Sequence, residues 1–315
     1  NVNTPNIGMY TDKDTITLEN NGTIEGGDKT VGIYGYNANL GATSTTKVGS
    51  GGTGVYSKGG NVTLNGKMSV GKNDSVGVYS ANGANSTTEI GNGTADSATL
   101  TVTDGGVGLY ADAGSKQTLK GLKATVSGTN TAGSILFYNI PSTSGGTAGK
   151  FDLSNNPGKA EIGAYSYAFY TSNNIFTSPT GFATFLNDWE NTGTGTGIAL
   201  TMKPGSSVLL ADLTNETNKN VLFSNIATIT SPLQNNNGQK VATLTGDYKY
   251  LTIKGPTEEY HIKRSTDGYV GYKVALALIQ EDTVHGGTII NDTTGVIDFR
   301  GERSIGLYTY LPNPS

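Results

Sequence analysis

Two short stretches of the sequence combine side chains that could bind a ligand. The first is GAYSYAFY, in which Tyr165 and Tyr167 lie two positions apart and therefore share one face of a strand. The second is the run Asn187, Asp188 and Trp189. Aromatic rings offer flat apolar faces for stacking, and amide and carboxylate groups hydrogen-bond to hydroxyl groups. These five residues are the candidate binding residues, and packing inside the protein is the alternative for each aromatic ring.

Catalysis by paired acids would require two carboxyl groups that face each other across a substrate. Asp188 and Glu190 are close in the chain, but side chains two positions apart on a helix point to different sides. The two histidines, His261 and His285, stand without a third ligand at a recognised metal-site spacing. The chain also has no cysteine and no nucleophile motif. We therefore expect no catalytic residue, no metal, no cofactor and no enzyme activity.

The composition indicates an ordered chain that carries little charge. Its 315 residues include 46 glycines and no cysteine, and its net charge is −4. A weak negative charge without a basic stripe argues against nucleic acid as a partner. No apolar run reaches the roughly 18 residues that a membrane-spanning helix needs. The missing cysteines fit an exported protein that forms no disulfides.

One phrase recurs along the chain: a small residue or valine, then glycine, an apolar residue and tyrosine. It is written TVGIYGYN, SVGVYSAN, GVGLYADA and SIGLYTYL, with looser copies IGMY and TGVY. The first marks, Tyr10, Tyr34, Tyr56 and Tyr79, are 24, 22 and 23 residues apart. Later marks stand at Tyr110, Tyr138 and Tyr170. A period in the twenties with drifting length is typical of a solenoid, in which loops lengthen but each coil closes.

Inside each unit the pattern has a period of two, which predicts strands. In VGIY, Val31 and Ile33 share one strand face, and Gly32 and Tyr34 share the other unless the chain turns there. Further strands such as TITLEN and NVTLNGKMSV are separated by turns rich in glycine and asparagine. Two or three short strands per unit predict an all-β parallel β-helix, since a propeller blade needs roughly 40 residues and a sandwich needs no repeat. Tyrosines of successive coils should stack about 4.8 Å apart as a ladder.

The repeated phrase disappears in the middle of the chain, where the apolar period changes. Apolar residues follow a helical spacing at Phe182, Phe185, Leu186 and Trp189. Ser178 can cap a helix there, Pro179 suits its first position and Gly193 lies just beyond its end. We therefore predict a short helix of about ten residues in this segment.

The same change of pattern divides the chain into three parts. Regular β-helix coils are predicted for residues 1–170, an irregular segment with the short helix and longer loops for 171–285, and a return to a regular coil for 286–315. The charged run over 256–268 is predicted to form a hairpin or protruding loop, and YKVALALI, at 272–279, a strand.

Two matching segments carry a resemblance to a known family. NGTIEGGDKTVGIY and TGVIDFRGERSIGLY share an acid after isoleucine, a glycine-containing turn, an acidic–basic pair and the tyrosine phrase. This pattern resembles the passenger domains of type V autotransporters, particularly the very large fusobacterial outer-membrane adhesins. The resemblance implies a right-handed parallel β-helix exposed on the bacterial surface. It also implies that the chain is a segment of a longer passenger, continuous with further coils and attached through a C-terminal membrane barrel outside these residues.

The function implied by that resemblance is adhesion. The partners would be host-cell glycans of the galactose type, host protein receptors or the surface of partner bacteria. A passive stalk that presents a distal adhesive tip is the alternative, and a polysaccharide-degrading β-helical enzyme is a third interpretation. The break in periodicity favours adhesion with binding in the 165–285 region, because insertions into a solenoid usually gather on one face.

Overall fold

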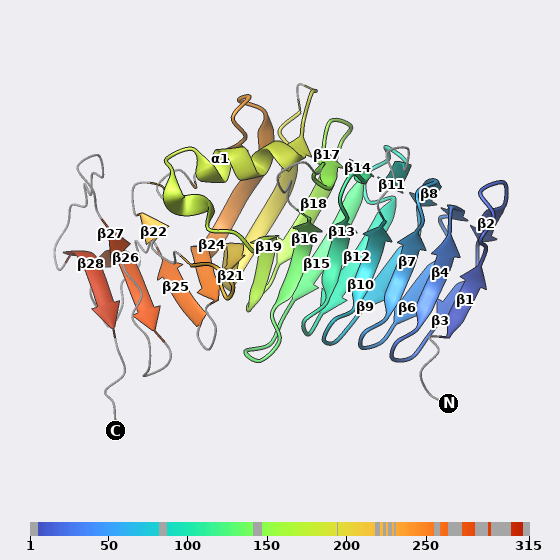
Figure 1. The fold of residues 1–315 in the computed structure, drawn as a ribbon, viewed down its shortest axis with the longest axis horizontal. Coiled ribbons are helices and arrows are strands. Elements are labelled where there is room, and N and C mark those ends of the chain that lie inside the picture. Colours follow the sequence, from blue (N-terminus) through green and yellow to red (C-terminus); the bar gives the residue numbers. More distant parts are fainter. Residues whose placement is uncertain are drawn as a thin grey trace.

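The computed structural model describes most of the chain up to residue 254 and isolated strands beyond it. The described residues are 6–81, 87–140, 147–193, 195–217, 221–222, 225, 229, 231–254, 259–263, 273–280, 289–290 and 304–310. They form one elongated stack of coils, with the first strands at one end and the last at the other (Figure 1). Strands pair in parallel from coil to coil, which confirms the predicted all-β parallel β-helix.

Each regular coil contributes one strand to each of three faces. The first face consists of β1 (Ile7–Tyr10), β4 (Val31–Gly35), β7 (Thr53–Ser57), β10 (Val76–Ser80), β13 (Val107–Ala111), β16 (Ser134–Asn139) and β19 (Ser166–Thr171). The second consists of β2 (Thr17–Asn20), β5 (Asn37–Leu40), β8 (Asn61–Leu64), β11 (Thr87–Gly91), β14 (Lys116–Lys120), β17 (Lys150–Asp152) and β20 (Trp189–Glu190). The third consists of β3 (Thr23–Glu25), β6 (Thr45–Val48), β9 (Lys67–Val70), β12 (Ala98–Thr103), β15 (Leu122–Ser127) and β18 (Gly158–Ile162).

Two long strands carry the solenoid into the segment that the sequence marks as irregular. In β21 (Ile198–Asp212), the first half pairs with β18 and the second half with β19, so the strand runs from the third face onto the first. β24 (Lys240–Lys254) pairs with β21 along both halves, with one register shift between Met202 and Ser206. The longer loops of this region therefore leave and rejoin the same stack of coils (Figure 1).

Beyond β24 the pairing changes direction. β25 (Glu259–Lys263), the described part of the charged run 256–268, pairs antiparallel with β24, and β26 (Lys273–Gln280) pairs antiparallel with β25. β28 (Ser304–Tyr310) then pairs in parallel with β26. Three short strands complete the set: β22 (Val221–Leu222), β23 (Leu233–Gln234) and β27 (Ile289–Ile290). The predicted return at 286–315 is thus described only in β27 and β28, and an antiparallel strand separates β28 from the earlier coils.

Apolar columns fill the interior of the solenoid. On the first face the inward column is Ile33, Val55, Val78, Leu109, Phe137, Phe169, Leu209 and Leu251, and each of these side chains is 0–1% exposed. Full burial of such a side chain contributes about 1.5–3 kcal/mol. The stack is therefore held by burial along its axis as well as by the ladder hydrogen bonds between coils.

The predicted alternation at the repeated phrase is wrong in one respect. Gly32 and Ile33 both face the interior, whereas Val31 and Tyr34 both face outward. A Cβ on Gly32 would lie 2.5 Å from the carbonyl oxygen of Gly54 in the next coil. Glycine therefore allows two neighbouring residues to face inward, and this local break in the period of two points the tyrosine to solvent.

The predicted helix exists, but it is shorter and starts later than the sequence pattern indicates. The 3₁₀ turn η1 (Ile175–Thr177) precedes α1 (Gly181–Phe185), and a second 3₁₀ turn, η2 (Leu186–Asp188), follows it. Thr180, rather than Ser178, stands at the N-cap of α1, and its side chain makes no capping bond. Trp189 begins β20 instead of ending the helix, because pairing with Phe151 draws it into the second face. Neither α1 nor the 3₁₀ turns of the described chain are long enough to span a membrane.

Candidate functional site

The tyrosines of the repeated phrase form one continuous ladder along the first face. The rings belong to Tyr10, Tyr34, Tyr56, Tyr79, Tyr110, Tyr138 and Tyr170, and neighbouring centroids lie 4.4–5.5 Å apart. Neighbouring ring planes are inclined by 7–17°, so the rings are stacked as predicted. Because each ring covers the face of the next, the ladder offers ring edges and hydroxyl groups to solvent.

Charged groups flank this ladder and act on its phenols. The Oη of Tyr79 donates a hydrogen bond to Oδ2 of Asp112 at 2.9 Å. Burial, together with the hydrogen bond to Asp112 and its charge, raises the pKa of Tyr79. Burial and the neighbouring Tyr138 raise the pKa of Tyr110. These phenols therefore hold their protons at a pH at which free tyrosine has lost its proton.

Tyr79 and Tyr110 should consequently lose their protons late. A free tyrosine has a pKa of about 10, and a raised pKa in the folded state means that the protonated phenols of Tyr79 and Tyr110 stabilise the fold below about pH 10. That stabilisation is lost as the pH rises from about 10 towards the folded-state pKa. We expect phenolate absorbance of the folded chain to rise later than that of the urea-unfolded chain, and the melting temperature to fall above about pH 10. Coincident titration of the two states would contradict the stacked, desolvated ladder.

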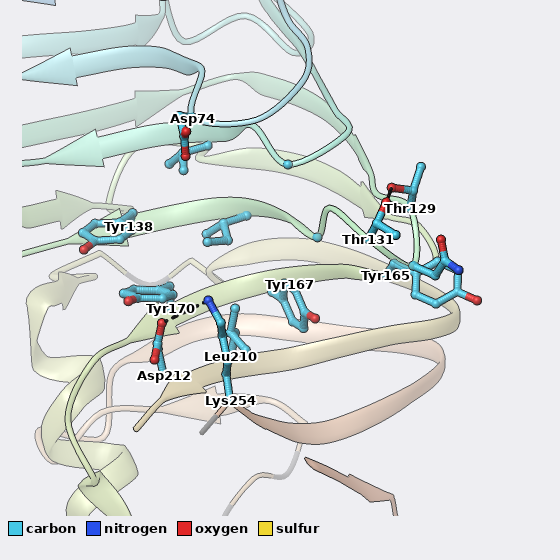
Figure 2. Close-up of a pocket in the computed structure, with 15 residues that line it drawn as sticks. Asp74, Thr129, Thr131, Tyr138, Tyr165, Tyr167, Tyr170, Leu210, Asp212 and Lys254 are labelled. Atoms are coloured by element: carbon cyan, nitrogen blue, oxygen red, sulfur yellow. Dashed lines mark hydrogen bonds and ion pairs between the residues drawn. The ribbon is translucent and has the colours of Figure 1, made fainter. Parts of the chain in front are cut away.

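A pocket of about 390 Å³ lies over the last rungs of the ladder (Figure 2). We call it the tyrosine pocket. Its apolar and aromatic lining consists of Val107, Ile135, Tyr138, Tyr165, Tyr167, Tyr170 and Leu210. The loop that carries Thr129 and Thr131 forms one rim, and the opposite side is formed by Asp212 and Lys254 (Figure 2). The pocket therefore combines an aromatic and apolar floor with polar and charged side chains around it, so it suits a ligand that has both apolar and polar faces.

Tyr165 stands at the rim of the tyrosine pocket in an uncommon backbone conformation. Its φ is 53°, in the left-handed region that non-glycine residues rarely adopt. Its N–H donates to the carbonyl oxygen of Gly205 at 3.1 Å, and its own carbonyl accepts from the N–H of Ser134 at 3.3 Å. These bonds to the neighbouring coils hold the turn, and 49% of Tyr165 stays exposed. Tyr167, by contrast, is 7% exposed and forms part of the wall.

The charged part of the tyrosine pocket depends on the register of two long strands. Asp212 of β21 lies opposite Lys254 of β24, and Lys254 Nζ is 3.6 Å from Asp212 Oδ2. The N–H of Thr214 donates to Asp212 Oδ1 at 3.1 Å and orients the carboxylate. No local sequence pattern marks this pair, because 42 residues separate the two side chains and only the coil register brings them together.

Trp189 lies in the core and does not line the tyrosine pocket. It is 0% exposed. The centroid of its ring lies 5.6 Å from the ring centroid of Phe151, 5.1 Å from that of Phe169 and 4.8 Å from that of Phe185. Of the two roles that the sequence allows, packing and ligand contact, the structure places this ring in packing. The ring presents no face to solvent.

Asn187 and Asp188 line a second pocket, of about 470 Å³, between the end of β19 and the helical segment. We call it the polar pocket. Oδ1 of Asn187 accepts a hydrogen bond from the N–H of Asn236 at 3.1 Å, which ties the helical segment to a distant turn. Oδ2 of Asp188 accepts from Nδ2 of Asn139 at 2.8 Å. The five candidate residues thus divide between the tyrosine pocket, the polar pocket and the core.

An ion-pair network lies beside the polar pocket on the second face. Nζ of Lys150 lies 2.6 Å from Oε1 of Glu190, and Nζ of Lys116 lies 3.3 Å from Oε2 of the same carboxylate. Lys116 also lies 3.1 Å from Asp152. Burial works against the charged form of Glu190, but the hydrogen bonds and charges of Lys150 and Lys116 together outweigh it and hold the pKa of Glu190 below its ordinary value. Among the described residues, no group of three or more His, Cys, Asp or Glu side chains could hold a metal ion.

Comparisons with protein-family models, with curated proteins and with solved structures found no match to this chain.

Proposed function

We propose that this chain is an adhesive segment of a surface-exposed autotransporter passenger, and that the tyrosine pocket binds a glycan of a host cell or a partner bacterium. The observation that carries the proposal is the concave aromatic floor at the end of an otherwise regular ladder, with an exposed tyrosine at its rim. The repeated phrase and its resemblance to autotransporter passengers support the cell surface as the location.

The chemistry of the pocket suits a sugar. A pyranose ring has an apolar C–H face that packs against an aromatic ring, and hydroxyl groups that need hydrogen-bond partners at its edge. The ladder rings cannot offer a free face because they stack on each other, whereas Tyr165 is half exposed at the rim. Asp212 and Lys254 provide an acceptor and donors on the opposite side. A sugar held between the two sides would therefore meet both an aromatic face and polar groups.

A passive stalk is the second candidate function, and the regularity of the earlier coils favours it. The registers Tyr34–Tyr56 and Tyr56–Tyr79 repeat without interruption along the first face, as they would in a spacer. A spacer, however, needs neither the helical segment nor the tyrosine pocket. Longer coils also cost ordering entropy, which a binding function would offset.

The test is binding of the purified chain to a glycan array and to cells before and after enzymatic removal of their glycans. We expect binding to glycans that share a terminal sugar, and loss of cell binding after deglycosylation. Cell binding that survives deglycosylation would point to a protein receptor instead. A folded chain that binds neither array nor cells would favour the stalk.

A further inference from the structure

The polar pocket carries many hydroxyl and amide side chains among apolar surface. The lining residues with a hydroxyl or amide group are Thr171, Asn173, Thr177, Ser178, Thr184 and Asn187. Ile175 and Phe185 add apolar surface, and Asp188 is the single charged residue among the described lining residues. The pocket is thus suited to a small ligand that is rich in hydroxyl groups and complementary to one negative charge.

The carboxylate of Asp188 is poorly compensated by the protein. Its one recorded hydrogen bond comes from Asn139, which is 3% exposed. The structure records no ion pair to Asp188 within the described residues, and the nearby Lys150 is 2.6 Å from Glu190 instead. Oδ1 of Asn139 is also buried without a hydrogen-bond partner among the described groups. A partly buried carboxylate that lines a pocket and has one hydrogen bond and no ion pair can accept a hydrogen bond from a cationic group of a ligand.

The walls of the polar pocket are fixed by bonds from a distant turn. Nδ2 of Asn236 donates to Oγ1 of Thr184 at 2.7 Å, while its backbone N–H donates to Asn187. These two bonds hold the face of the helical segment that lines the pocket. A ligand would therefore bind to a largely preformed site. Its binding would cost less free energy for ordering protein side chains than binding to a flexible site would.

We propose that the polar pocket binds an amino sugar, with the ligand's ammonium group paired to the carboxylate of Asp188. The sugar's hydroxyl groups would replace water on the threonine, serine and asparagine side chains of the lining. This inference is independent of the tyrosine pocket, because the two pockets share no lining residue among those that the structure describes.

The electrostatics of Asp188 give the proposal a pH signature. Burial raises the pKa of Asp188 to about 6, against the lowering effects of the bond from Asn139 and the charge of Lys150, while Glu190 raises it further. An ammonium group binds the ionised carboxylate, so bound ligand lowers this pKa and binding weakens as the pH falls through about 6. If the pKa of the complex lies about two units lower, affinity at about pH 5 should be about tenfold weaker than at about pH 7.

The experiment compares D-glucosamine with D-glucose, which differ in one ammonium group against one hydroxyl group. Ligand-observed NMR titration of the full chain should give at least about tenfold tighter binding of glucosamine at about pH 7. Asp188→Asn should abolish that preference and its pH dependence, and asparagine can still accept the bond from Asn139. Asp12→Asn removes the same charge from an exposed corner, where the Asp12 side chain is 54% exposed, and should change neither.

Two results would overturn the proposal. One is equal affinity of the wild-type chain for glucosamine and glucose. The other is a glucosamine preference that survives in Asp188→Asn, with circular dichroism showing an intact fold. If, in that second case, Tyr165→Ala loses the preference, the amino sugar binds in the tyrosine pocket.

Discussion

Replacing Trp189 with alanine is expected to lower the free energy of unfolding by about 3–5 kcal/mol. The ring is fully buried, and it packs against Phe151, Phe169 and Phe185. Removing it would leave a cavity between the second face and the helical segment, and each neighbouring ring would lose contacts that it cannot recover elsewhere.

Urea denaturation followed by far-ultraviolet circular dichroism measures this effect, since the chain has no other tryptophan to report on. Trp189→Phe should cost less because most of the ring volume stays. Tyr165→Ala, at a half-exposed position, should stay within about 0.5 kcal/mol of wild type. A Trp189→Ala cost below about 1 kcal/mol would show that the aromatic cluster does not anchor the helical segment.

The second large effect is expected at a glycine of the repeated phrase. Gly77→Ala would place a Cβ 2.4 Å from the carbonyl oxygen of Gly108 in the next coil and 3.1 Å from Leu100 Cδ1. Backbone atoms of a stacked coil cannot move aside without disturbing the hydrogen bonds between neighbouring coils. We expect a loss of about 1–3 kcal/mol, although glycine-to-alanine changes at unstrained positions usually stabilise by about 0.4–1 kcal/mol.

Gly27 provides the matched control for this substitution. A Cβ there meets no atom within 4 Å, so Gly27→Ala should be neutral or slightly stabilising in the same urea titration. If both alanine variants proved equally stable, the glycine of the repeated phrase would not be required for the close approach of the coils.

The repeat made the fold predictable, because a phrase that recurs every 22–24 residues fixes both the strand and its register. Tyr34, Tyr56 and Tyr79 stack as that register requires. Where the phrase is absent, the local spacing of apolar residues was a weaker guide to secondary structure. The spacing of Phe185 and Trp189 is helical, but pairing with Phe151 placed the tryptophan in a strand.

The candidate sites were predictable only in part. Tyr165 and Tyr167 stand out in the sequence as alternating aromatics, and both line the tyrosine pocket. Asp212 and Lys254 carry no local signal, since their meeting depends on the register of β21 and β24. A single sequence also cannot tell whether an aromatic residue points in or out where glycine breaks the alternation, as it does at Gly32.

The most direct test of the account is a matched pair of tyrosine variants measured on the best glycan from the array. Tyr165 is 49% exposed at the pocket and Tyr10 is 57% exposed on the first coil, so the two alanine variants remove equivalent rings from different places. Glycan recognition in the tyrosine pocket predicts that Tyr165→Ala weakens binding about tenfold, or about 1.4 kcal/mol, while Tyr10→Ala binds as wild type does. Equal affinity of Tyr165→Ala and the wild-type chain, or equal losses in both variants, would contradict it.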